Sequence, residues 1–148
     1  MSDQRPFGGG VSGTALDDFP RPSCAETLGY EFISIDREAK AMKVAFAGTE
    51  ALLNPAGTIQ GGFLTAMLDD AMGSMLVALF NGEKLPSSVD IHTQYLRPAQ
   101  LGRFICEARL KYATNSTAFV EATLYNDANE AVAHAVQTAR LFPARGRK

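Results

Sequence analysis

The sequence predicts an α+β fold in which a six-stranded antiparallel sheet covers one long apolar helix. We expect the helix from Phe63 to Phe80, where nearly every side chain is apolar or small apart from Asp69 and Asp70. A segment that is apolar on all faces must be buried, so it belongs at the centre of the domain. Runs of alternating apolar and polar residues flank it, as expected for strands with one face on a core.

Length and composition indicate a single globular domain. The chain has 148 residues, 46% of them hydrophobic, and a net charge of −2, which allows one core and gives no basic surface for nucleic acid. Cys24 and Cys106 lack metal-ligand spacing and no phosphate loop occurs, so we expect neither a metal nor a cofactor. Isolated cysteines and the lack of a signal-peptide pattern favour a cytoplasmic location.

The central helix is long enough to raise the question of a membrane span. An apolar segment of this length could cross a bilayer, but each aspartate at mid-depth would cost about 2.5–3.5 kcal/mol. The strand-like runs after it have no place in a helical membrane protein. We therefore expect a buried core helix and no membrane partner.

Three segments are expected along the chain. Residues 1–20 are rich in glycine and poor in apolar side chains, which is typical of a flexible arm. Residues 21–143 form the folded domain. Residues 144–148 form a basic tail, which is either solvated or in contact with an anionic ligand.

The secondary-structure pattern within the domain is regular. The strand-like runs span residues 30–35, 42–46, 87–96, 103–113, 117–125 and 131–142. A short helix over 24–28 should be capped by Ser23 and ended by Gly29, and residues 49–53 should form one helical turn. After the long helix, Asn81-Gly82 is a stop signal. A helix wrapped by strands in this order is the hotdog fold.

The start of the long helix has the features of an acyl-transfer site. Gly61 and Gly62 leave backbone N–H groups unshielded, and the helix dipole adds a partial positive charge where an oxyanion could develop. Asp69 follows two turns later, where an acid could assist the reaction. The alternatives are that the glycines only allow close packing and that Asp69 is a structural acid with satisfied hydrogen bonds.

Several features together resemble the PaaI-type acyl-CoA thioesterases of the hotdog superfamily, over about residues 24–142. They are Asn54 and Gly57 ahead of Gly61-Gly62, an acid nine residues after Gln60, Ser88-Val-Asp90, and Tyr95-Leu-Arg97-Pro98-Ala99 followed by Gly102. Family members usually have His-Gly-Gly where this chain has Gln60-Gly61-Gly62. In the family that histidine positions the loop asparagine, and a glutamine amide can both donate and accept in the same role.

The resemblance implies a role for each site residue. The N–H of Gly61 would donate to the thioester oxygen, while Gln60 and Gly62 would contact the substrate. Asp69 would act as general base on water or as a nucleophile, and it would come from the neighbouring subunit. Asn54 would bond near the thioester, or only shape an Asn-Pro turn. Ser88 would help to hold the attacking water, or be an ordinary serine at a strand edge.

Other polar residues near these motifs have structural explanations. Asp70 lies about 100° around the helix from Asp69, so we expect it to meet a backbone, Ser or Thr donor instead of the ligand. His92 and His134 fall in separate strands without metal-ligand spacing, and both are expected to be core or sheet-face residues.

The combined prediction is an acyl-CoA thioesterase that hydrolyses an acyl- or aryl-acyl-CoA by acid-assisted attack of water. Two alternatives stay open: a non-catalytic module that binds or senses acyl-CoA, and a hotdog hydratase or dehydratase. We expect a homodimer or a dimer-of-dimers tetramer, because pairing removes the exposed edge of a long strand.

Overall fold

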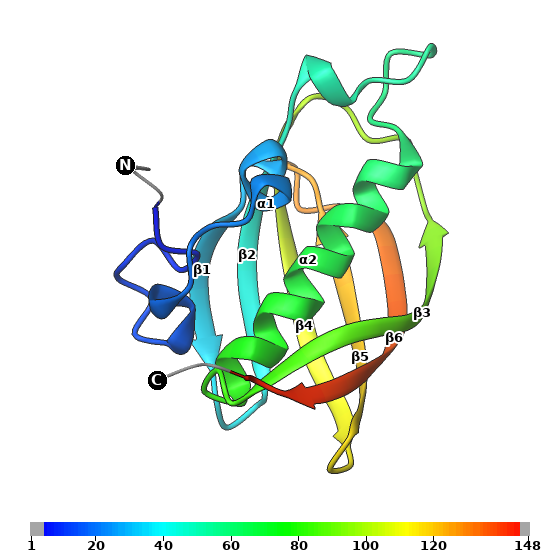
Figure 1. Cartoon of the computed structure of the whole chain (residues 1–148). Coiled ribbons are helices and arrows are strands. Elements are labelled where there is room, and N and C mark those ends of the chain that lie inside the picture. Colours follow the sequence, from blue (N-terminus) through cyan, green and yellow to red (C-terminus); the bar gives the residue numbers. More distant parts are fainter. Residues whose placement is uncertain (1–4, 146–148) are drawn as a thin grey trace.

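The protein is described by a computed structural model that covers residues 5–145. The strands are β1 (Glu31–Asp36), β2 (Ala41–Gly48), β3 (Lys84–Tyr95), β4 (Gly102–Ala113), β5 (Thr117–Tyr125) and β6 (Ala131–Pro143). All six form one antiparallel sheet in the order β1-β2-β4-β5-β6-β3, which curves around the long helix α2 (Gly61–Leu79) (Figure 1). The α+β class and the hotdog fold are therefore confirmed.

Helix α2 begins and ends at residues that break regular backbone geometry. Gln60 precedes it in an extended conformation, and Asn81 and Gly82 follow it with positive φ values of 55° and 72°. The N–H of Gly82 donates back to the carbonyl of Val77 at 2.8 Å, which satisfies a carbonyl of the last turn. The stop signal at Asn81-Gly82 is confirmed.

The core is built from one side of the sheet and about half of the residues of α2. The buried residues of the helix are Leu64, Met67, Leu68, Ala71, Met72, Ser74, Met75, Leu76 and Ala78. Each large apolar side chain removed from water contributes about 1.5–3 kcal/mol to folding. By length and composition α2 could cross a membrane, but half of it is buried inside this fold, which is the pattern of a core helix.

The segment before residue 21 is packed against the domain over its described part. It contains a short 3-10 helix, η1 (Ala15–Asp18), in which Leu16 has no exposed surface. The N–H of Phe7 donates to the carbonyl of Phe19 at 2.7 Å and closes this segment into a loop. The composition of residues 1–20 predicts a flexible arm, because only a few apolar residues, such as Leu16, pack this segment against the domain.

The short helix and the helical turn are both present. Helix α1 is Ser23–Leu28, and Gly29 ends it in the left-handed conformation with φ of 68°. The prediction that Ser23 caps the helix is wrong, because Pro22 occupies the cap position and Ser23 is already helical. A proline fits there because it needs no hydrogen-bond partner for an N–H. The turn expected over 49–53 is the 3-10 helix η2 (Glu50–Leu52).

Candidate active site

Three polar side chains from three elements meet where α2 faces the edge of the sheet. Asp69 comes from α2, Ser88 from β3 and Gln137 from β6. The Ser88 hydroxyl donates to Oδ1 of Asp69 at 3.0 Å. The Nε2 of Gln137 donates to Ser88 Oγ at 3.0 Å and also to Asp69 Oδ1. The structure therefore brings together the two residues expected from sequence, Asp69 and Ser88, and adds a third.

A β-bulge determines which residues of β3 join this site. The register along β6 shifts between Ser88 and Asp90, with Ser88 opposite Ala139 and Asp90 opposite Thr138. Because side chains alternate between the faces of a strand, the bulge directs Ser88 toward the helix and Asp90 toward the other face. Simple alternation would put both residues on one face.

Gln137 is a functional candidate that the sequence reasoning missed. Its side chain is only 4% exposed and lies on the inner face of β6 between Ala135 and Ala139. Buried polar groups are nearly always hydrogen-bonded, so a glutamine at an inward position of an alanine-rich strand is itself a signal. In the sequence, the inward positions 135, 137 and 139 of β6 read Ala, Gln and Ala, and the glutamine is the exception that could have been noticed.

The start of α2 lies beside a shallow pocket. Gly61 and Gly62 occupy the first turn, and their N–H groups have no acceptor among the described residues. A pocket of about 520 Å³ opens here, with Gly61, Tyr95 and Arg97 in its lining. A Cβ added to Gly61 would lie 3.0 Å from Cζ of Tyr95, so the ring packs directly on this glycine.

Two threonines hold Tyr95 in this position. The Tyr95 hydroxyl lies 2.6 Å from Oγ1 of Thr65 on α2. The Thr65 hydroxyl in turn donates to Oγ1 of Thr93 at 3.0 Å. Tyr95 is half exposed, at 53% of its surface. The aromatic ring therefore forms a fixed wall beside the exposed N–H groups at the helix start.

Asn54 shapes its own loop. Its Oδ1 accepts from the N–H groups of Ala56 and Thr58, at 3.0 and 3.1 Å, and its Nδ2 donates to Oγ1 of Thr58 at 3.0 Å. Gly57 supports the turn with a positive φ of 82°. These bonds match the turn alternative given for Asn54.

Within the part of the chain that the structure describes, the side chains of Gln60 and Asn54 form no hydrogen bond with each other, although the family resemblance implies one. The side chain of Gln60 is exposed, while its N–H donates to the carbonyl of Leu52 at 2.9 Å. Asn54 is held by Thr58 instead, because an Asx-type turn satisfies the amide locally. The loop therefore keeps its shape without the partner that a histidine supplies in the family.

Asp70 lies on the other side of α2 in a buried environment. Its Oδ2 has no hydrogen-bond partner within the described part of the chain, contrary to the expected Ser, Thr or backbone donor for this oxygen. Burial, reinforced by the negative charge of Asp69, raises the pKa of Asp70 to about 7, and Arg21 opposes the shift. The two neighbouring aspartates thus have separate surroundings, as their angular separation on the helix predicts.

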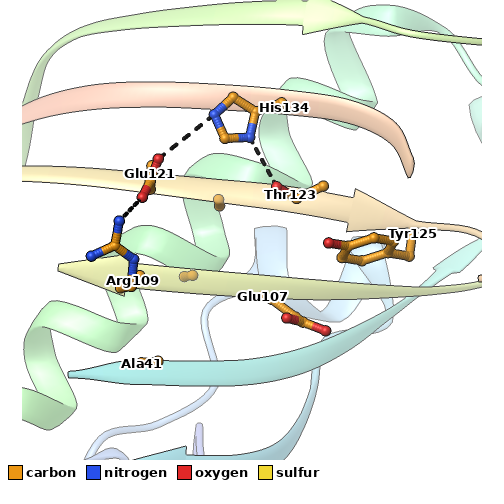
Figure 2. Close-up of a pocket in the computed structure, with 9 residues that line it drawn as sticks. Ala41, Glu107, Arg109, Glu121, Thr123, Tyr125 and His134 are labelled. Carbon is orange, nitrogen blue, oxygen red and sulfur yellow. Dashed lines mark hydrogen bonds and ion pairs between the residues drawn. The ribbon is translucent and has the colours of Figure 1, made fainter. Parts of the chain in front are cut away.

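The histidines lie away from this site. Figure 2 shows a second hollow, on the face of the sheet turned away from α2, where His134 contacts Thr123 and Glu121. The Nδ1 of His134 is 2.9 Å from Oγ1 of Thr123, its partner in register across β5 and β6. Glu121 also pairs with Arg109, the residue opposite it on β4. The cluster consists of cross-strand pairs that stabilise a sheet, and His134 cannot reach Asp69.

His92 lies on the same outer face. It is exposed and stands opposite Val136, the neighbour of the inward-facing Gln137. Both histidines are therefore sheet-face residues, as predicted.

A helix with an acid, wrapped by a hotdog sheet and begun by two glycines, defines a thioesterase-like class of protein. A profile of the Thioesterase superfamily matches residues 56–133, more than half of the chain. The chain belongs to this superfamily, and its fold and motifs are of the PaaI type. No match was found among curated proteins.

Solved structures agree with this assignment. The phenylacetic acid degradation-related protein of Ralstonia eutropha is 33% identical, with a TM-score of 0.80 over 85% of this chain and 95% of that one. PaaI of E. coli, from the phenylacetic acid degradation operon, is 20% identical, with a TM-score of 0.75 over 83% and 86%. A Streptococcus mutans protein bound to acetyl CoA is 20% identical, with a TM-score of 0.69 over 78% and 90%.

Proposed function

We propose that the protein is an acyl-CoA thioesterase that hydrolyses an acyl- or aryl-acyl-CoA with Asp69 as its catalytic carboxylate. The observation that carries the proposal is the group of Asp69, Ser88 and Gln137, which presents a carboxylate of the core helix at the edge of the sheet. Membership of the Thioesterase superfamily supports the reaction class. The acetyl CoA bound by the Streptococcus mutans protein supports a coenzyme A thioester as the ligand.

The proposed reaction uses water and two protein groups. Asp69 accepts a proton from water, and the resulting hydroxide attacks the thioester carbonyl carbon. The N–H of Gly61 at the start of α2 donates to the oxyanion of the tetrahedral intermediate. When the intermediate collapses, the carbon–sulfur bond breaks, and the coenzyme A thiolate leaves and takes up the proton held by Asp69, which regenerates the carboxylate. Attack by the carboxylate itself, through a mixed anhydride, stays the alternative mechanism.

Helix geometry supports a site shared between two subunits. Gly61 and Asp69 are separated by eight residues, which corresponds to about 12 Å along the axis of α2. One thioester cannot contact both groups of a single chain at hydrogen-bonding distance. We propose that Asp69 meets a substrate bound at Gly61 of a neighbouring subunit, in a homodimer or a dimer of dimers joined at the edge strand β3.

The other two functions have less support. A hydratase or dehydratase generally uses a histidine with its acid, whereas His92 and His134 lie on the outer face of the sheet. A binding or sensing module would not need the hydrogen-bonded carboxylate of Asp69.

The proposed function is tested by hydrolysis of a panel of acyl-CoA thioesters, with a colorimetric reagent for the free thiol. We expect turnover of at least one thioester by the wild-type protein. Tight binding of a non-hydrolysable acyl-CoA analogue without turnover of any thioester would favour the sensing module instead.

A further inference from the structure

Gln137 has an unusual position for a polar side chain. Its amide is buried on the inner face of β6 and contacts two members of the candidate site at once. Burying an amide without partners is costly, on the order of 1–3 kcal/mol on the basis of protein substitutions. Here both of its known contacts are made by Nε2, the donor atom, and both go to site residues.

We propose that Gln137 is the positioning residue of the acid: it fixes Oδ1 of Asp69 and leaves Oδ2 as the oxygen that meets the substrate or water. The inference rests on the proposed function, because it assigns the reactive atom of that site. Asp69 receives both of its hydrogen bonds from described residues on Oδ1, one from Ser88 and one from Gln137. Oδ2 has no partner among those residues.

The donor and acceptor count of the group supports this assignment. The NH2 of Gln137 has two protons, one for Asp69 Oδ1 and one for Ser88 Oγ. The single proton of Ser88 is used by its own bond to Asp69. Ser88 is then left only with an acceptor site, so it can orient a water by accepting one of the water's protons.

The arrangement also fixes charge and direction. Amide and hydroxyl donors stabilise an ionised carboxylate, the form that can accept a proton from water. Because Gln137 is buried in a sheet strand, its amide has little freedom to turn, and the plane of the Asp69 carboxylate is set with it. A misplacement of about 1 Å can cost on the order of 100-fold in rate.

The matched test replaces Gln137 by methionine, which keeps the length and volume of the side chain and removes the donor. We expect Gln137→Met to lower kcat about 10- to 100-fold with little change in KM. In an Asp69→Asn background the same substitution should lower kcat no further, because the carboxylate that Gln137 positions is already gone. Gln94→Met, at an exposed position on β3, is the control and should leave both quantities unchanged.

Folding and oligomeric state are checked for both variants by circular dichroism and sedimentation. A folded Gln137→Met protein with the wild-type kcat would overturn the proposal. A loss of kcat that is just as large in the Asp69→Asn background would also overturn it, because disturbed packing would then explain the loss.

A second readout requires neither activity nor a stable Gln137 variant. The side-chain amide protons of Gln137 donate to the Asp69 carboxylate, so their resonances should move in Asp69→Asn, as followed by 1H–15N NMR. Amide protons whose resonances stay in place in Asp69→Asn would overturn the inference. If no thioester is hydrolysed, the proposed function fails, and this spectrum still decides whether Gln137 holds Asp69.

Discussion

Two adjacent aspartates on one helix meet opposite surroundings in this protein. Asp69 faces the edge of the sheet, is half-buried and accepts hydrogen bonds from Ser88 and Gln137. Asp70 faces the interior near Tyr30 and Arg21, and its Oδ2 has no partner in the described residues. A helical step of about 100° therefore separates a carboxylate prepared for chemistry from one whose pKa burial raises to about 7, so that it is only partly ionised at neutral pH.

The Asp70 side of α2 is not empty of polar groups. The Tyr30 hydroxyl donates to Oγ of Ser74 at 2.8 Å, and Ser74 lies one turn after Asp70 on the same face of the helix. Burial raises the pKa of Tyr30, so its hydroxyl stays neutral. The Tyr30 hydroxyl is used by Ser74, and the Ser74 hydroxyl donates to the carbonyl of Ala71 at 3.3 Å, so neither hydroxyl supplies a hydrogen bond to Oδ2 of Asp70.

The largest effect should come from neutralising Asp69, the half-buried member of the pair at the edge of the sheet. Asp69→Asn keeps shape and polarity but removes the base, so turnover should fall on the order of 10²–10⁴-fold. Binding of a non-hydrolysable acyl-CoA analogue should change little, since the carboxylate acts mainly in the transition state. Steady-state hydrolysis and calorimetric binding measure the two quantities. Asp70→Asn is the matched control, and equal small losses in both variants would remove Asp69 from its assigned role.

A smaller but substantial loss is expected at the helix start. In Gly61→Ala the new Cβ would lie 3.0 Å from Cζ of Tyr95, so the ring or the helix must move at the proposed oxyanion site. We expect kcat/KM to fall about 10- to 100-fold, less than the roughly 10²–10³-fold loss on removal of an oxyanion donor, because the N–H is displaced and not removed. Gly62→Ala is the comparison, since its Cβ would be 3.9 Å from its nearest neighbour, Nε2 of Gln60. A larger loss at Gly62 than at Gly61 would contradict the assignment.

The buried member of the pair should affect stability and its pH dependence. Because the pKa of Asp70 rises from 3.8 to about 7 on folding, the folded protein holds a proton between those values that the unfolded chain has lost. The free energy of unfolding therefore falls as pH rises through this range, by up to about 4 kcal/mol for a shift of this size.

Asp70→Asn should flatten this dependence. We expect it to raise the free energy of unfolding at pH 8 on the order of 1–3 kcal/mol relative to wild type, and to change it less or lower it at pH 5. Urea unfolding at several pH values measures the effect. Glu38→Gln, in the exposed turn after β1, serves as the control. If the free energy of unfolding of Asp70→Asn depends on pH as strongly as that of the wild type, the Asp70 carboxyl is not the source of the pH dependence.

The smallest expected effect concerns the cation that opposes the shift. Arg21 lowers the pKa of Asp70, so Arg21→Met should move the midpoint of the pH-dependent loss of stability to higher pH. Part of the stability change will have another origin, because the guanidinium also donates to the carbonyl of Tyr30. The midpoint, followed by thermal unfolding across pH, isolates the electrostatic part. A midpoint that moves to lower pH would contradict the account.

The fold and the acid were predictable because they rest on strong local patterns. An apolar run of helix length and alternating runs of strand length predict α2 and the six strands, since burial dominates folding. The strand boundaries were less predictable. The sequence predicts the third strand from residue 87, but β3 begins at Lys84 and includes Pro86, which is tolerated because β3 is at the edge of the sheet. Asp69 stands out because a carboxylate in an apolar helix needs an explanation.

The remaining parts of the site depend on contacts between segments that are distant in sequence. Gln137 joins Asp69 across 68 positions, and only the register of β3 and β6 shows that they meet. The bulge after Ser88 is likewise a property of strand pairing. The missing donor for Oδ2 of Asp70 depends on how Tyr30 and Ser74 use their own hydroxyls.

The central claim is that Asp69 of one subunit acts on a thioester bound at Gly61 of its neighbour. Co-expression of Asp69→Asn and Gly61→Val chains with two different tags yields purified mixed dimers. The account predicts that each parent is nearly inactive and that the mixed dimer regains about half of the wild-type turnover, because one of its two sites combines an intact Asp69 with an intact Gly61. A mixed dimer as inactive as its parents would contradict the claim, since each site would then draw both residues from a single chain.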